Sequence, residues 1–101
     1  MNCQEVEVTS EPLTPHATKR WIRSVLDEGK VIPSKHARQE MAKDKLDLSD
    51  CLNVLRAGTC EPGENENGSW RYRVATSRMC VVVARLSDTE LMIVTAWRFR
   101  S

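Results

Sequence analysis

Arginines recur at alternate positions in the last third of the chain, and that spacing could place several of them on one surface. Arg71 and Arg73 lie two residues apart in one apolar segment, and Arg98 and Arg100 lie two apart in another. Side chains two residues apart on a β-strand share a face. If the aromatic faces of both segments point into the core, we expect four guanidinium groups on the opposite side of one small sheet. A guanidinium fork binds phosphate or carboxylate well, although an ordinary solvated position is the alternative for each arginine.

His36 is the candidate for proton transfer, because histidine changes its charge near neutral pH. It stands where we expect the first turn of a helix, so a packing or hydrogen-bonding role is the alternative. His16 occupies the same place in an earlier helix and is a second candidate. An acid or base would have to lie near the arginine surface to act together with it.

Aromatic side chains flank the arginines on the expected strands. Tyr72 lies between Arg71 and Arg73, but alternation points it to the opposite face, where core packing is expected unless a bulge re-aims it. Trp70 and Trp97 could stack on bases, although core packing is the commoner role of an aromatic residue on a strand.

The charge of the chain is divided unevenly, although its net value is only +1. Residues 1–68 hold 9 Lys/Arg and 12 Asp/Glu, which gives 9 − 12 = −3. Residues 69–101 hold 6 Arg and 2 acids, which gives 6 − 2 = +4. The excess of basic charge therefore falls where the strands are expected, and all of it is arginine.

The four cysteines indicate neither a metal site nor a disulfide framework, because no two of them form a C-x-x-C pair. Cys51 and Cys80 lie in apolar segments and are expected in the core. The first 13 residues are polar and acidic, unlike a signal peptide, and no apolar run approaches membrane-spanning length. We therefore expect a reduced, cytoplasmic protein.

Three helices are expected before the strands. They cover residues 15–28, about 34–43 and about 48–57. Thr14 followed by proline is a typical start for the first, and Gly29 is expected to stop it in a left-handed conformation. The residues around Pro33 form a brief extended link to the second helix.

Three strands are expected at residues 69–75, 79–86 and 90–99, after a loop at residues 59–68. The middle strand is apolar on both faces, as a central strand would be. This order predicts an α+β fold in which three N-terminal helices pack on one face of a three-stranded antiparallel meander. Residues 1–13 are expected to be a flexible acidic tail, with an added edge strand around residues 6–8 as the alternative, and residues 14–101 a single domain.

Three stretches resemble toxin-type ribonuclease domains of the RelE superfamily. They are Thr14-Pro15-His16 with the helix that ends at Gly29-Lys30-Val31, then Lys35-His36-Ala37-Arg38 leading to Leu46-Asp47-Leu48-Ser49-Asp50-Cys51-Leu52-Asn53-Val54-Leu55, and Leu91-Met92-Ile93-Val94-Thr95-Ala96-Trp97-Arg98. The likeness lies in their order and spacing, and it spans most of residues 14–98. More narrowly, the chain resembles MqsR-like messenger-RNA interferases and an uncharacterised bacterial family related to them.

The resemblance implies a compact α+β fold with a cleft on the sheet, RNA cleavage without a metal or other cofactor, and a partner antitoxin. Arg98 matches the basic residue near the end of the last strand in MqsR-like toxins, and His36 matches the related uncharacterised family. The strand tyrosine of those toxins falls near Cys80, which has no phenol, and their catalytic lysine and glutamine have no counterpart in this chain.

Two hypotheses of different classes follow. In the first, the protein binds RNA and is a metal-independent endoribonuclease, with His36 and Arg98 as catalytic residues. Its RNA-binding residues are then Arg71, Tyr72, Arg73 and Arg100. In the second, it is a non-catalytic interaction domain that retains the toxin fold and binds a partner protein, such as an acidic antitoxin segment.

Overall fold

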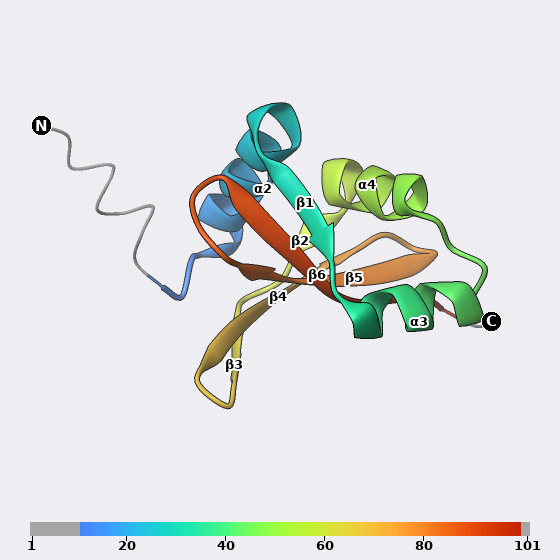
Figure 1. The fold of residues 1–101 in the computed structure, drawn as a ribbon. Helices are drawn as coiled ribbons and strands as arrows, with labels where there is room; N and C mark the ends of the chain where they lie inside the picture. Colours follow the sequence, from blue (N-terminus) through green and yellow to red (C-terminus); the bar gives the residue numbers. More distant parts are fainter. Residues whose placement is uncertain (1–10, 100–101) are drawn as a thin grey trace, which may run out of the picture.

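The structure is a computed structural model, and it describes residues 11–99. Its elements follow one another as α2 (Pro15–Glu28), β1 (Lys30–Pro33), α3 (Lys35–Lys43), α4 (Leu48–Ala57), β2 (Thr59–Cys60), β3 (Glu64–Glu66), β4 (Ser69–Ala75), β5 (Met79–Arg85) and β6 (Glu90–Arg98). The predicted α+β class is confirmed, with three helices and a sheet (Figure 1). No helix in the described part of the chain is long and apolar enough to cross a membrane.

Each helix begins at a residue whose side chain satisfies a free backbone donor. The Thr14 hydroxyl accepts from the Ala17 N–H (3.1 Å) at the start of α2. The Ser34 hydroxyl caps α3 in the same way, and Asp47 caps α4. In α4 the cap is reciprocal, because Asp50 also accepts from the Asp47 N–H (3.0 Å). These caps explain why the starts of the helices were predictable.

Gly29 ends α2 for a reason other than the expected one. Its φ of −112° is extended backbone, so the prediction of a left-handed stop is wrong. A Cβ at this position would lie 2.1 Å from the Thr89 carbonyl oxygen. The adjacent Lys30 N–H donates to that same oxygen (2.8 Å). Glycine is therefore required because the backbone before β6 passes directly over it.

The sheet has six strands, in the order β1-β6-β5-β4-β2, with β3 also paired to β4. The antiparallel meander of β4, β5 and β6 is as predicted, but the sheet is larger and mixed. The expected link at residues 31–33 is part of β1, which pairs parallel with β6. The expected loop at residues 59–68 contains β2 and β3, because both find free backbone partners on β4. An edge strand around residues 6–8 lies outside the described residues.

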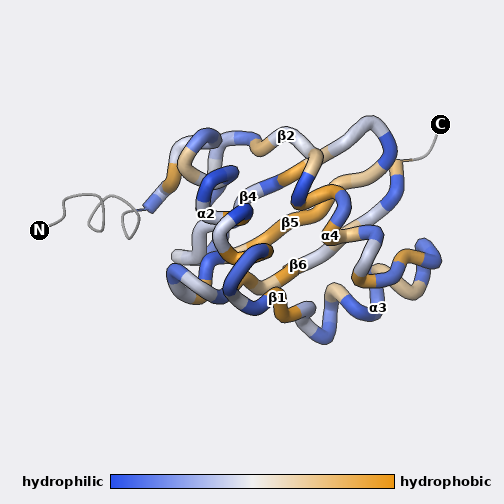
Figure 2. Tube along the Cα trace, turned by 90° about the horizontal axis from the view of Figure 1, so that it is seen from above, coloured by the Kyte–Doolittle hydropathy of each residue, from blue (hydrophilic) through white to orange (hydrophobic). Residues whose placement is uncertain are grey.

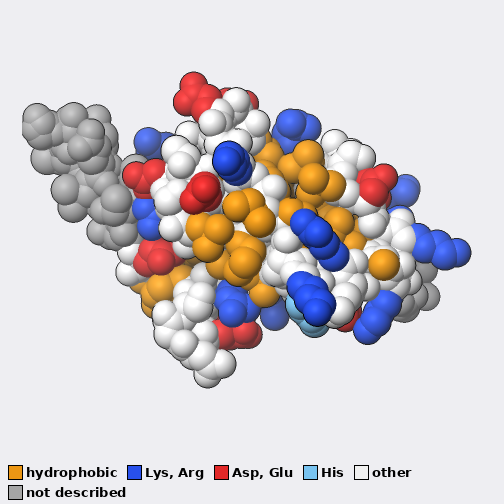
Figure 3. All heavy atoms as spheres, viewed as in Figure 1, with side chains coloured by type: hydrophobic (Ala, Val, Ile, Leu, Met, Phe, Trp, Pro, Cys, Tyr) orange, Lys and Arg blue, Asp and Glu red, His pale blue; other side chains and the backbone are white. Residues whose placement is uncertain are grey.

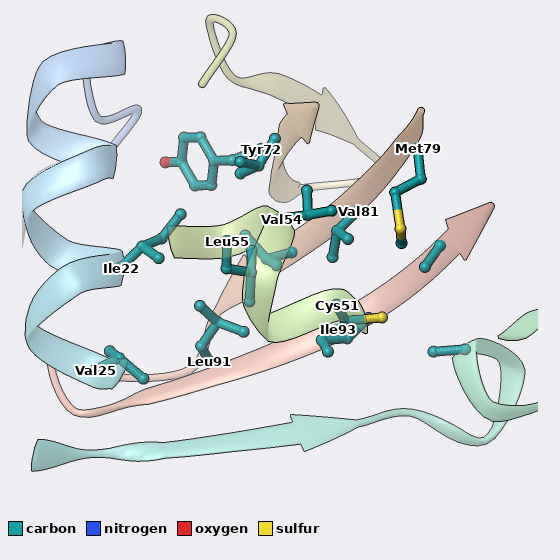
Figure 4. Packing of buried hydrophobic residues seen from close by; sticks show 14 of the residues in the cluster. Ile22, Val25, Cys51, Val54, Leu55, Tyr72, Met79, Val81, Leu91 and Ile93 are labelled. Atoms are coloured by element: carbon teal, nitrogen blue, oxygen red, sulfur yellow. The ribbon is translucent and has the colours of Figure 1, made fainter. Parts of the chain in front are cut away.

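The hydrophobic core lies between the helices and one face of the sheet (Figures 2 and 4). The sheet contributes alternate residues to it: Tyr72, Val74, Met79, Val81, Val83, Leu91, Ile93 and Ala96. From the helices come Ile22 and Val25 of α2, together with Leu55 of α4, all about 1% exposed or less. Ala37 and Met41 of α3 belong to the same cluster. All three helices therefore pack on the same side, and we call the other side of the sheet the open face.

One extra residue in β6 changes which of its side chains reach the core. Val82 pairs with Thr95, but Val83 pairs with Ile93, so Val94 is bulged between them. Leu91 and Ile93 face the helices before the bulge, whereas Ala96 does so after it. A bulge of this kind shifts the alternation by one residue. Every β6 side chain beyond Val94 is therefore on the face opposite to the one that strict alternation predicts.

The segment before α2 is fixed to the sheet by the single tyrosine. The Tyr72 hydroxyl accepts from the Leu13 N–H (3.1 Å) and donates to the Glu11 carboxylate (2.8 Å). Leu13, which we expected in a flexible tail, is 4% exposed and belongs to the core. Residues 11–13 are therefore part of the folded domain rather than of a tail, and the rest of the expected tail, residues 1–10, lies outside the described residues.

Tyr72 is the only tyrosine, so its ionisation can be followed alone. Burial raises its pKa to about 12, and the Glu11 carboxylate acts in the same direction, against the Leu13 N–H. Because the raised pKa favours the neutral phenol in the folded state, we expect full stabilisation below pH 10 and progressive loss as the pH rises toward 12. Absorbance of tyrosinate near 295 nm should show a midpoint about two units above that of the urea-unfolded chain. Equal midpoints would contradict this.

Candidate functional site

The open face carries arginine on one side and larger apolar side chains on the other. Residues paired across the strands share a face, so its rows can be read from the register. These rows are Arg71–Ala84–Met92–Ile32, Arg73–Val82–Thr95 and Ala75–Cys80–Trp97. The central strand β5 supplies small apolar residues between the two sides.

Arg71 and Arg73 project from β4, as predicted, and each lies near a glutamate of β3. The distance from Arg71 Nη1 to Glu66 Oε1 is 3.4 Å, and that from Arg73 Nη2 to Glu64 Oε1 is 3.9 Å. Both glutamate side chains are at least 60% exposed. Exposed ion pairs of this length contribute about 0–1 kcal/mol. Both guanidinium groups can therefore exchange these partners for a stronger anion.

Arg71 is held in a position that does not favour stability. Its side chain is 27% exposed, and its Nε is covered without a hydrogen-bond partner among the described residues. A buried unpaired donor costs about 1–3 kcal/mol. The position therefore places a positive charge over the open face with one of its donors unpaired, a feature that Arg85 shares.

The middle of the open face is covered without a helix. Cys80, Val82 and Ala84 are 3%, 8% and 5% exposed, yet none of them belongs to the core between helices and sheet. The longer residues of β4 and β6 on either side must cover them. Burial raises the pKa of the Cys80 thiol, although Arg73 opposes the effect. Cys80 is thus a neutral packing residue rather than a nucleophile.

Arg98 lies on the opposite side of the sheet from Arg71 and Arg73, so the expectation of a shared arginine face is wrong for it. Beyond the Val94 bulge, Arg98 pairs with the core-facing Met79. Its Nε donates to the Asp44 carbonyl oxygen (2.9 Å), and its Nη2 donates to the Lys45 carbonyl oxygen (3.4 Å). The guanidinium therefore provides hydrogen-bond donors for free backbone carbonyl groups at the carboxyl end of α3.

The same bulge brings Trp97 to the open face, where alternation had not placed it. Trp97 pairs with Cys80 and is only half-buried. Tyr72, in contrast, is fully buried on the helix side and bonded to Glu11, so the prediction that it contacts RNA is wrong. The bulge could not be predicted because residues 91–97 are nearly all hydrophobic. In such a run the hydrophobic pattern does not show where the alternation of side chains changes face.

His36 and Arg98 are held at opposite ends of α3. His36 is exposed in the first turn, whereas Arg98 bonds to Asp44 directly after the last turn. Eight residues of helix span about 12 Å. Figure 3 shows Lys and Arg side chains gathered toward the end of the molecule where α3 lies. The structure therefore does not bring the two predicted catalytic residues together.

The remaining predicted groups lie elsewhere. His16 is exposed in the first turn of α2, on the helix side, and Arg100 is outside the described residues. Among residues 11–99, no three His, Cys, Asp or Glu side chains are placed to hold a metal ion. Chemically, the open face offers two cations, a partly exposed indole and an apolar centre, which suits binding of a polyanion with planar groups.

Comparison with known proteins identifies one family. The family model described as Domain of unknown function (DUF4258) matches residues 33–98, more than half of the chain. No curated protein and no solved structure matches the chain. The matched part includes α3, α4 and the whole antiparallel sheet, and hence every residue of the open face except Ile32.

Replacing Arg98 should chiefly affect stability. Arg98→Ala removes the bonds to the Asp44 and Lys45 carbonyl oxygens, and we expect the free energy of unfolding to fall by about 1 kcal/mol in urea titrations. Arg78→Ala is the matched control, because Arg78 is exposed and its side chain makes no bond to the described residues. Its effect should stay within about 0.5 kcal/mol. Equal effects of the two variants would contradict the bracing role of Arg98.

Proposed function

The chain belongs to the DUF4258 family, and we propose that it binds single-stranded RNA on the open face of its sheet, as a protein of the toxin ribonuclease type. The observation that carries the proposal is the placement of Arg71, Arg73 and Trp97 on one uncovered surface. The resemblance to messenger-RNA interferases points in the same direction but rests on order and spacing.

The two arginines supply the phosphate contacts. They lie two residues apart on a rigid strand, so their Cα atoms are about 7 Å apart. Their side chains are 27% and 47% exposed, and the only carboxylates within 4.0 Å of them in the described structure are those of the exposed glutamates Glu66 and Glu64 of β3. A phosphate is a better partner than an exposed carboxylate, because it accepts bidentate charge-assisted bonds.

Trp97 supplies the base contact. It lies two strands away from the arginines, a spacing of about 10 Å across the sheet. Single-stranded RNA can place its phosphates at β4 and turn a base onto the indole, whereas bases in a duplex are already stacked. The nearby Phe99, 47% exposed, offers a second ring just beyond β6. A sheet with cations along one strand and aromatic rings along another favours unpaired RNA.

Cleavage is the separable part of the proposal. Metal-independent cleavage needs a base, an acid and cations at one phosphate. His36 is the described histidine on α3, and Arg98 is the basic residue that the family likeness would assign to catalysis, but their separation along α3 does not support joint action. Binding is therefore better supported than cleavage.

The second candidate function is binding of a partner protein without catalysis. It is favoured by the apolar surface of the open face, where Ile32 is 38% exposed next to Met92. In the view of Figure 3, hydrophobic side chains are also exposed in the middle of the molecule, on the side where β1 lies in front in Figure 1. Incubation with a long RNA in EDTA separates the two: cleavage lost in His36→Ala supports the enzyme, whereas intact RNA at high protein concentration supports a binding domain.

Removing the two arginine charges should weaken RNA binding and its salt dependence. For Arg71→Gln/Arg73→Gln we expect the slope of log K against log salt to decrease by about 1.4, since each single-strand phosphate contact contributes about 0.7. Fluorescence anisotropy with a labelled single-stranded oligonucleotide measures it. Arg20→Gln/Arg23→Gln removes the same charge from α2 and should leave the slope nearly unchanged. A similar loss in both variants would indicate unspecific attraction.

Trp97→Ala should reduce affinity for single-stranded RNA without changing the salt slope. Loss of one base stack costs about 1–3 kcal/mol, which is about 5- to 150-fold in the dissociation constant. Trp97→Phe keeps a ring and should recover part of the loss. Duplex RNA of the same sequence should bind more weakly than the single strand and respond little to either variant. If Trp97→Ala reduced the affinity for duplex and single-stranded RNA equally, the proposed stacking contact would be contradicted.

A further inference from the structure

A small pocket opens between α2 and α4, on the other side of the molecule from the open face. Its volume is about 190 Å³, and all six residues around it come from these two helices: Lys19, Arg23, Leu26, Asp27, Leu55 and Arg56. Leu55 is fully buried and Leu26 partly buried, so the floor is apolar. The rim holds three cations and one carboxylate, a balance of 3 − 1 = +2.

Lys19 is already engaged and closes one end of the pocket. Its Nζ donates to the carbonyl oxygens of Leu55 (3.4 Å), Arg56 (3.0 Å) and Gly58 (2.6 Å). These are the free acceptors at the carboxyl end of α4, where a cation is favoured. Lys19 therefore fixes α4 against α2 and keeps the pocket in shape, rather than binding a ligand itself.

Arg23 and Arg56 are the two cations of the rim that form no ion pair with the described residues. Both are exposed, and neither lies within 4.0 Å of a carboxylate oxygen in the described part of the chain. Arg23 and Asp27 are four residues apart on α2, yet even this pair makes no ion pair. Two guanidinium groups thus stand beside an apolar floor without an anion of their own.

The size and lining of the pocket select the class of ligand. Pockets for small organic ligands usually measure about 300–1,000 Å³, so this one is the size of a side chain. It has no aromatic residue on which a base could stack, which disfavours RNA. An aliphatic side chain would fill the space above Leu26 and Leu55, and a flanking carboxylate would meet Arg23 or Arg56.

We propose that the α2–α4 pocket is a docking site for an acidic segment of a partner protein, which inserts one aliphatic side chain and pairs its carboxylates with Arg23 and Arg56. This site is independent of the proposed RNA surface, since no residue belongs to both. The protein can therefore hold a protein partner on its helix side while the open face stays uncovered.

The test uses the full chain and a short fluorescein-labelled peptide in which one leucine is flanked on both sides by glutamates. We expect saturable binding in anisotropy titrations, with backbone amide shifts in ¹⁵N NMR spectra concentrated at Leu26, Leu55 and their neighbours. Arg23→Glu/Arg56→Glu should weaken binding by about tenfold or more. Arg38→Glu/Arg78→Glu changes the net charge equally at exposed sites that lie outside α2 and α4, and it should weaken binding much less.

A matched peptide with glutamine in place of glutamate should bind at least several-fold more weakly, because it lacks the charge that Arg23 and Arg56 recognise. Urea unfolding confirms that each variant folds. Failure to saturate, equal binding of the two peptides, or equal losses in the two double variants would overturn the proposal. So would peptide-induced shifts at Arg71 and Arg73, or single-stranded RNA that shifts the α2–α4 amides instead.

Discussion

The extra residue at Val94 is the constraint on which the surface of this protein depends. It lets β6 pair with β5 along its whole length while its side chains change faces halfway. Before the bulge, β6 gives Leu91 and Ile93 to the core. After it, the strand gives Trp97 to the open face and sends Arg98 to the end of α3. One residue thus decides both what the open face can bind and how α3 is braced.

Prediction from the sequence succeeded where local physics decides the structure. Helix starts were readable because Thr14 and its counterparts satisfy nearby N–H groups, and β4 and β5 followed simple alternation. It failed where the deciding contact is distant in the chain. The residues around Pro33 carry no local signal that Lys30–Pro33 form a strand. They do so because they pair in parallel with β6, some sixty residues later in the chain.

One missed element did have a signal. Asn67-Gly68 is a typical two-residue hairpin turn, and both residues have positive φ, 55° and 86°. That turn could have predicted β3 inside the expected loop. The candidate site was predictable only in part. Alternation along β4 assigned Arg71 and Arg73 to the correct face. The face of Trp97 depends on the bulge at Val94, which hydrophobic periodicity does not reveal.

The position of β6 has a consequence for how the chain acquires its structure during synthesis. β6 is the last strand in sequence, yet it lies inside the sheet between β1 and β5, and α3 packs against it. On a ribosome, β6 therefore begins 57 residues after the end of β1 (90 − 33) and 47 residues after the end of α3 (90 − 43), so both are synthesised well before their partner. A nascent chain halted before Ala96 would expose the apolar sides of both, which makes completion of the last strand the step that commits the domain to its fold.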